Sequence, residues 1–242
     1  MKLAKLLTVF IPLIWSWSVT GNAQTINEYS LDFRASANGI AATAIRSLAR
    51  TSADTFELAN TLTASPGGQV IAKIEQVSTL QLTDSALRPL AYRYQQSGLS
   101  QAIQAINYNW EAMLAISADA EETWTIDLSN ATYDQLSHQL FLRQALANNS
   151  TDLNFAVIDE DEIEIHRYRL IGKEIVATPL GNFNSTKVQR IRDEDDDRST
   201  VFWLADDWDY LLVRMEQINS GLTILLELNN GVLSGEAIRP LD

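Results

Sequence analysis

Short segments in which apolar and polar residues alternate, separated by turn residues about every ten positions, constrain the fold of this chain most strongly. The clearest segment runs from Tyr29 to Ala35 and is followed by Asn38-Gly39. Asn-Gly between two such segments favours a two-residue hairpin turn, because both turn residues need positive φ. The alternation therefore predicts an antiparallel, mainly β chain.

The same pattern predicts further strands along most of the chain. They are expected at Ile40–Leu48, Thr55–Leu62, Val70–Val77, Leu90–Gln95, Ala102–Tyr108, Thr123–Asp127, Leu153–Ile158, Ile163–Leu170, Thr186–Arg192, Thr200–Leu204, Tyr210–Ile218 and Thr223–Leu228.

One segment has the period of a helix instead. Its apolar residues at helical spacing are Tyr133, Leu136, Leu140, Phe141 and Leu146. Thr132 and Gln135 fit a capping box, in which each side chain bonds the backbone N–H of the other residue. We therefore expect a helix over Thr132–Asn148, followed by the polar stretch Asn149-Ser150.

These elements predict a curved antiparallel sheet or half-open β-barrel with one amphipathic helix. The chain has 242 residues, 46% of them hydrophobic, and no cysteine. A chain of this length buries about 70% of its unfolded surface, so it needs neither disulfides nor a structural metal. No linker or repeat divides it, so residues 24–242 are expected to form a single domain.

The first 23 residues have the layout of a secretory signal peptide. Lys2 and Lys5 precede the apolar run Leu6–Val19, and small residues allow cleavage between Ala23 and Gln24. The alternative, a membrane anchor, needs about 20 apolar residues. This run has 14 and is interrupted by a proline and two serines. Without a cysteine to acylate, the chain is not a lipoprotein. We expect a periplasmic, soluble product rather than an integral membrane protein.

Charge and composition exclude several classes of function. The formal charge is −13, which disfavours nucleic acid and anionic membrane surfaces as partners, because both require a basic face. The absence of cysteine excludes thiolate catalysis and iron–sulfur clusters. Pro66-Gly67-Gly68 lacks the lysine and the following helix of a phosphate loop, so we expect no nucleotide and no cofactor.

No metal site is expected either. The two histidines, His138 and His166, have no metal-ligand spacing and are predicted to be partly exposed on amphipathic elements. The acidic run Asp193–Asp197 resembles a calcium loop only superficially. Arg198 replaces the glycine at position six, and Leu204 replaces the glutamate at position twelve.

The cluster Asp206-Asp207-Trp208-Asp209 allows two interpretations. Paired carboxylates beside an indole ring are found in glycosidases, but acidic residues are also common in turns between strands. No nucleophile elbow of the G-x-S-x-G kind is present. We favour the acidic turn, assign no catalytic residue, and keep a glycan hydrolase as the less favoured alternative.

The order of several short motifs resembles a bacterial exported family, domain of unknown function 3108, over Tyr29 to Leu228. The motifs are Leu87-Arg-Pro-Leu-Ala-Tyr92, Asn107-Tyr-Asn-Trp110, Asp127-Leu-Ser, Leu142-Arg143, Lys173 to Gly181, Lys187-Val-Gln-Arg, and Phe202-Trp203-Leu-Ala-Asp with Tyr210 and Val213-Arg214. One departure is Leu212, where the family usually has a proline before the Val-Arg pair. The resemblance implies a periplasmic β-rich single domain with no assigned reaction.

Two hypotheses of function follow, and neither is enzymatic. In the first, the half-barrel binds a lipid or other apolar ligand between sheet and helix, by fold-level analogy with envelope carriers. Strand aromatics are its sequence support, and Trp110, Trp203 and Tyr210 are the predicted ligand contacts. In the second, the chain is an accessory protein that binds another envelope protein through a sheet edge.

Overall fold

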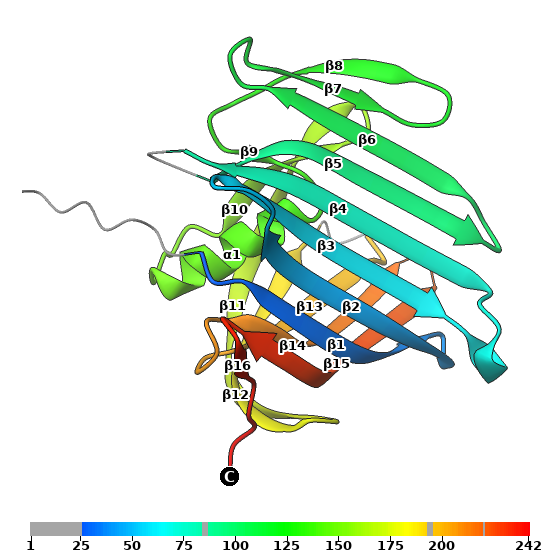
Figure 1. Ribbon diagram of the computed structural model, residues 1–242, viewed down its shortest axis with the longest axis vertical. Coiled ribbons are helices and arrows are strands. Elements are labelled where there is room, and N and C mark those ends of the chain that lie inside the picture. The colour runs from blue at the N-terminus through cyan, green and yellow to red at the C-terminus, as the bar shows by residue number, and fades with distance from the viewer. Residues whose placement is uncertain (1–25, 84–86, 193–195, 220) are drawn as a thin grey trace, which may run out of the picture.

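The computed structural model describes residues 26–83, 87–192, 196–219 and 221–242. In these residues a single 16-stranded sheet curls around the helix α1 (Ser137–Ala147), with a short 3-10 turn, η1 (Pro66–Gly68), between β3 and β4 (Figure 1). The strands are β1 (Tyr29–Ala37), β2 (Ile40–Arg50), β3 (Thr55–Ala64), β4 (Ala72–Leu82), β5 (Leu87–Gly98), β6 (Ala102–Asn109), β7 (Leu114–Ala118), β8 (Thr123–Asp127), β9 (Thr132–Tyr133), β10 (Asn154–Asp159), β11 (Glu162–Thr178), β12 (Gly181–Ile191), β13 (Ser199–Ala205), β14 (Leu211–Asn219), β15 (Leu222–Leu233) and β16 (Glu236–Ala237). The predicted signal peptide and its cleavage site, Ala23 and Gln24, lie outside the described residues.

Strand order explains the barrel-like shape. The sheet runs β8-β7-β6-β5-β4-β3-β2-β1-β15-β14-β13-β12-β11-β10-β9, so β1 and β15 join the two halves. Its two edge strands, β8 and β9, are consecutive in the chain and are separated only by residues 128–131. A chain advances at most about 3.6 Å per residue, which keeps these two edges within about 18 Å of each other. The sheet is therefore curled but not closed.

Neighbouring strands are antiparallel, except for the short parallel pair of β9 and β10. The predicted Asn-Gly turn joins β1 and β2, with φ of 48° at Asn38 and 78° at Gly39. Pro89 lies inside β5 rather than before the strand, next to a register shift between Thr79 and Leu80. Such an irregularity accommodates a residue that cannot donate to the ladder. The predicted mainly β half-barrel with one helix is confirmed.

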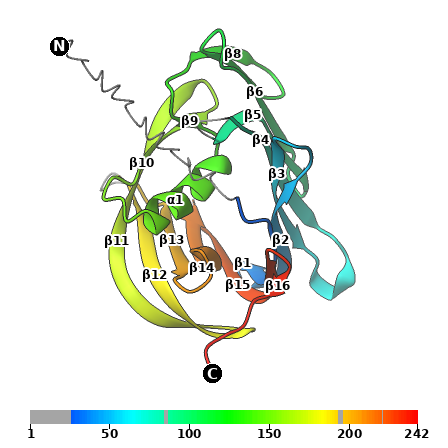
Figure 2. The ribbon, with the colours of Figure 1, turned by 60° about the vertical axis from the view of Figure 1, so that its left-hand side comes forward.

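Figure 2 shows how the helix sits in the curled sheet. Strands β10–β12 lie on one side of α1 and β3–β6 on the other, with β1 and β15 between them. The inward side chains of the sheet form one buried core with the apolar side of the helix, including Leu136, Leu140 and Leu146. No helix of the described chain is long and apolar enough to cross a membrane.

The predicted start of the helix is wrong. Thr132 belongs to β9, and its Oγ1 bonds the backbone of Ser129 rather than a helical N–H. The Asp134 Oδ1 atom instead accepts the N–H groups of Leu136 at 2.9 Å and Ser137 at 2.7 Å. The Asp134 N–H in turn donates to Ser137 Oγ at 3.0 Å, which completes a reciprocal cap.

Strands β7 and β11 also differ from the sequence prediction. Strand β7 was not expected, because Leu114–Ala118 is short and follows directly on a turn. Strand β11 continues through an irregularity between Leu170 and Gly172 to Thr178, whereas the prediction ended it at Leu170. A bulge shifts the alternation by one residue, so a period of two no longer identifies the strand beyond it.

Candidate functional site

The concave face of the sheet holds two adjoining cavities that form one groove. The first, of about 150 Å³, lies beneath α1, and the second, of about 250 Å³, continues toward the hairpin between β14 and β15. Both are lined by Asn60, Gln76, Met215, Gln217 and Leu226. Because these side chains are shared, the two cavities can hold parts of one ligand.

The cavity beneath the helix is lined by cationic and polar side chains. Arg46, Arg190, His138 and His166 line it together with Tyr168, and no aspartate or glutamate does. Arg190 is paired with Glu164 at 2.8 Å. The formal charge of −13 describes the molecule as a whole, but this interior surface has the opposite character.

Arg46 is the unusual member of this group. It follows Ala44 on the inward face of β2 by period-two alternation, and only 9% of it is exposed. Its side chain has no hydrogen bond or ion pair with any residue that the structure describes, and its Nε atom is fully buried. Burial and the nearby Arg143 lower the pKa of the guanidinium. A buried charge without a partner is costly to a folded protein.

The two histidines are buried, so the prediction that they are partly exposed is wrong. His138 is 3% exposed and His166 is 1% exposed, and their ring centroids lie 4.8 Å apart. His138 Nδ1 lies 3.1 Å from the Asp134 carbonyl oxygen, and its Nε2 lies 2.8 Å from the Tyr168 hydroxyl. Burial lowers the pKa of both rings, that of His166 to about 3. Both rings are therefore neutral near pH 7.

His166 contributes an unused polar atom. Its Nε2 lies 3.2 Å from a Glu164 carboxylate oxygen, while its Nδ1 is buried without a hydrogen-bond partner. In the neutral ring an Nε2–H that donates to Glu164 leaves the Nδ1 lone pair facing its surroundings.

The groove changes character along its length. On the wall formed by β3–β5, Asn60 Nδ2 donates to Gln76 Oε1 at 2.9 Å, and Gln76 Nε2 donates to the Tyr92 hydroxyl at 3.0 Å. Farther from the helix the apolar lining residues are Ala44, Leu62, Ile74, Leu222, Ile224 and Leu226. Tyr94, Gln96 and Asn219 also line this part, so the groove is mainly polar beneath α1 and mixed, with more apolar side chains, toward the β14–β15 hairpin.

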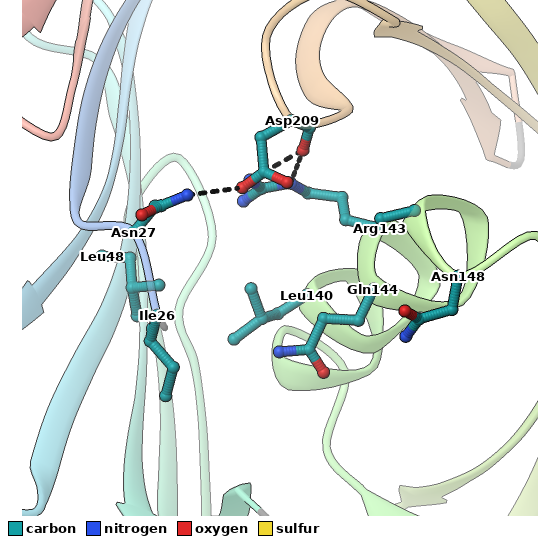
Figure 3. Close-up of a pocket in the computed structure, with 9 residues that line it drawn as sticks. Ile26, Asn27, Leu48, Leu140, Arg143, Gln144, Asn148 and Asp209 are labelled. Atoms are coloured by element: carbon teal, nitrogen blue, oxygen red, sulfur yellow. Dashed lines mark hydrogen bonds and ion pairs between the residues drawn. The ribbon is translucent and has the colours of Figure 1, made fainter. Parts of the chain in front are cut away.

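A separate cavity of about 160 Å³ lies between α1 and the residues that precede β1 (Figure 3). Arg143 contributes to its wall and pairs with the Asp209 carboxylate at 3.3 Å, and Asn27 donates to the same carboxylate at 3.4 Å. The Asp209 carboxylate therefore compensates the charge of Arg143, whereas the charge of Arg46 has no such partner among the described residues.

None of the three aromatic residues predicted to contact ligand lines the groove. Trp110 donates to the Pro89 carbonyl at 2.6 Å and stacks on Tyr108. Tyr210 follows the acidic turn, with a φ of 52°. Their role in binding stays a prediction.

Trp203 lies on the opposite face of β13 from the inward residue Phe202, because neighbouring side chains of a strand alternate. Its Nε1 donates to Glu174 Oε1 at 2.5 Å. Lys187 and Arg214 lie 4.8 and 5.2 Å from the ring centroid. These charged side chains cover the indole on the outer surface of the sheet.

The cluster Asp206-Asp207-Trp208-Asp209 forms the turn between β13 and β14, as the favoured interpretation predicts. The carboxylate of Asp206 accepts hydrogen bonds from Lys173 at 2.8 Å and Thr186 at 2.6 Å. Asp207 accepts one from Asn184 at 3.1 Å. With Asp209 bound to Arg143, each carboxylate of the cluster has a structural partner.

Residues 28–227 match the family described as "Protein of unknown function (DUF3108)". The chain belongs to this family. The match spans most of the half-barrel, from just before β1 into β15, and so includes every residue that lines the groove.

Among solved structures, this DUF3108 chain is similar to a "Beta-barrel-like Protein of Domain of Unknown Function DUF1849 from Brucella abortus". The TM-score is 0.55 at 9% identity, over 85% of this chain and 97% of the other. A putative lipoprotein from Parabacteroides distasonis is also similar, with a TM-score of 0.33 at 10% identity over 85% and 95% of the two chains. None of the curated proteins matches the chain. The first likeness supports the barrel-like fold alone.

Sequence reasoning about this DUF3108 chain missed the residues that line the groove. One face of β2 carries Ala42, Ala44 and Leu48, and by alternation Arg46 lies on that same inward face. A charged residue within a run of small and apolar inward positions was a signal for an interior polar site. In the strand register, Asn60 of β3 lies opposite Arg46 of β2, and Gln76 of β4 lies opposite Asn60.

Proposed function

We propose that this DUF3108 protein is an exported, non-catalytic binding protein of the Gram-negative periplasm that holds a single-chain amphiphile in its interior groove. The observation that carries the proposal is the change in lining along one continuous groove, from mainly polar beneath α1 to more apolar toward the β14–β15 hairpin. An amphiphile has the same division between head group and chain.

The dimensions agree with this ligand class. Small-molecule sites are concave, mostly apolar and carry a few polar groups that orient the ligand. Cavities of about 150 and 250 Å³ suit one acyl chain better than a two-chain phospholipid. Helix α1 and the sheet both contribute lining residues, His138 and Gln139 from the helix and Leu62 and Ile74 from the strands. A ligand there is enclosed on several sides.

The contacts of His138 support a binding role more than a catalytic one. Histidine acts as a general base through a nitrogen within hydrogen-bond reach of the reacting group. Both nitrogens of His138 are already engaged, by Asp134 and by Tyr168. Their partners hold the ring in place as part of the wall.

A titration of the mature protein with the fluorescent fatty acid 11-(dansylamino)undecanoic acid tests the proposal. Leu62→Trp adds a large ring to the apolar part of the groove, and Ile45→Trp adds the same ring to an exposed outward position on the neighbouring strand β2. We expect saturable binding in the wild type, a loss of at least tenfold in affinity for Leu62→Trp, and no change for Ile45→Trp. Absence of saturable binding in the wild type, or equal affinities for both variants, would overturn the proposal.

A second candidate is an accessory protein that binds another envelope protein. In the described part of the chain, β8 is an edge strand that pairs only with β7. A free edge can accept a strand from another protein. Native mass spectrometry of protein purified from its own envelope separates the two candidates: a co-purifying lipid supports the carrier, and a co-purifying protein supports the accessory function.

A further inference from the structure

We infer that the end of the groove beneath α1 is a binding site for an anionic head group, a carboxylate or a phosphate monoester, with Arg46 as its anchor. This inference rests on the proposed function and adds the chemical class of the ligand's head group. Three observations on the described residues support it.

The first observation is that Arg46 has no partner. Its side chain is more than nine-tenths buried and lines the cavity beneath α1, and it forms no hydrogen bond or ion pair with any described residue. A methionine of similar length would fill the same space without the cost of burying a charge. Stability of the empty protein therefore does not account for an arginine at this position.

The second observation is that the fold supplies carboxylates to other inward or buried arginines. The pairs are Arg143 with Asp209 at 3.3 Å, Arg190 with Glu164 at 2.8 Å and Arg192 with Asp196 at 3.3 Å. Arg46 lies in a cavity whose lining contains no aspartate or glutamate. An anion that enters the groove would supply the missing charge.

The third observation is the set of polar groups around this charge. Asn60 lies directly across from Arg46 in the β2–β3 register, and Gln139 reaches the same cavity from α1. Asn60 already donates one amide hydrogen to Gln76, and Gln139 donates one to the Gln135 carbonyl. The second N–H of each amide and the guanidinium can donate to the acceptor oxygens of a carboxylate or phosphate. The more apolar part of the groove begins beyond these groups, so the head group would lie beneath α1 and the chain toward the β14–β15 hairpin.

Competition among ligands with the same chain tests the inference. Dodecanoate, dodecyl phosphate and dodecanol share a twelve-carbon chain, and each is added below its micellar concentration to mature protein loaded with the dansyl fatty acid. We expect either or both anions to displace the probe at concentrations at least tenfold lower than dodecanol. The better of the two anions identifies the head group as carboxylate or phosphate.

Variants assign the effect to Arg46. Arg46→Met should weaken the binding of the preferred anion at least tenfold, leave that of dodecanol unchanged, and raise the melting temperature of the ligand-free protein. Arg34→Met, which removes an exposed outward arginine of β1, should change none of these. Arg46→Gln retains a polar side chain without the charge and should lose anion binding in the same way, so the test does not depend on one variant folding.

The outcomes separate the inference from the function on which it rests. Equal displacement by dodecanol and by both anions in the wild type would overturn the anionic site and leave the carrier intact. Unchanged anion binding in folded Arg46→Met or Arg46→Gln would also overturn it. Absence of binding by the probe and by all three competitors would overturn the proposed function together with this inference.

Discussion

The carboxylate of Asp134 joins the start of α1 to the opposite wall of the half-barrel, so its removal should be unusually costly. Asp134 is fully buried, and its Oδ1 accepts three hydrogen bonds, from the Leu136 and Ser137 N–H groups and from Ser78 Oγ at 2.6 Å. Ser78 lies on β4, 56 residues earlier in the chain. The first helical hydrogen bond, from the His138 N–H, also ends on the Asp134 carbonyl.

Asp134→Ala removes all three acceptor contacts of this side chain at once. The loss of a capping side chain costs about 1 kcal/mol. A buried hydroxyl that loses its acceptor, here that of Ser78, adds about 1–3 kcal/mol. Release of the buried charge offsets part of this cost, because burial raises the pKa of the Asp134 carboxyl. We expect Asp134→Ala to lower the free energy of unfolding by about 2–4 kcal/mol, from a total of about 5–15 kcal/mol for typical proteins.

Asp134→Asn is the informative comparison, because it keeps the Oδ1 acceptor and removes the charge. Its free energy of unfolding at pH 7 should stay within about 1 kcal/mol of the wild type, since weaker hydrogen bonds are offset by a lower burial cost. Urea unfolding followed by tryptophan fluorescence measures both variants, and Asp161→Ala in the exposed β10–β11 turn is the control. A loss below 1 kcal/mol for Asp134→Ala, or equal losses for the Ala and Asn variants, would refute this account of the helix start.

Three further predictions concern the termini, metals and pH. N-terminal sequencing of protein from the periplasm should begin at Gln24, after cleavage at Ala23, and recovery of the full-length chain in the membrane fraction would contradict this. EDTA should leave the melting temperature unchanged, because no group of three or more His, Asp or Glu side chains in the described residues is arranged to hold a metal ion. A melting temperature that falls by several degrees in EDTA and is restored by one metal would refute this prediction. Stability should fall as the pH drops from about 6.5 toward 3, because the unfolded chain protonates His138 and His166 first, while burial lowers the pKa of both in the folded state. His166→Asn should flatten this decline in a series of urea titrations, and an unchanged slope would show that other groups cause it.

Much of the fold could be predicted because strand alternation and turn chemistry are local properties. The hairpin at Asn38-Gly39 follows from two adjacent residues that tolerate positive φ, and the inward face of β2 follows from the parity of Ala42, Ala44 and Leu48. A helix after β8 was likewise visible in the 3.6-residue spacing of its leucines. These features need no knowledge of what lies across the sheet.

The start of the helix was decided by tertiary structure. Thr132–Gln135 and Asp134–Ser137 are both plausible caps over a few residues of sequence. The second forms because β9 pairs with β10 and fixes Thr132 in a strand, and because Ser78 of β4 donates to Asp134. Both contacts link residues that are far apart in the chain, so no local pattern could distinguish the two caps.

The candidate site depends on long-range structure even more. Strand alternation could have placed Arg46 on an inward face, but its lack of a partner depends on where Glu164 and Asp209 lie after the sheet has curled. The same curl buries His138 against His166 and Tyr168. Which face a side chain takes is set by the backbone geometry of its own strand. Which charges meet across the barrel is set by strand order and curvature, because these bring together residues that are distant in the sequence, such as Arg143 and Asp209, which are 66 positions apart.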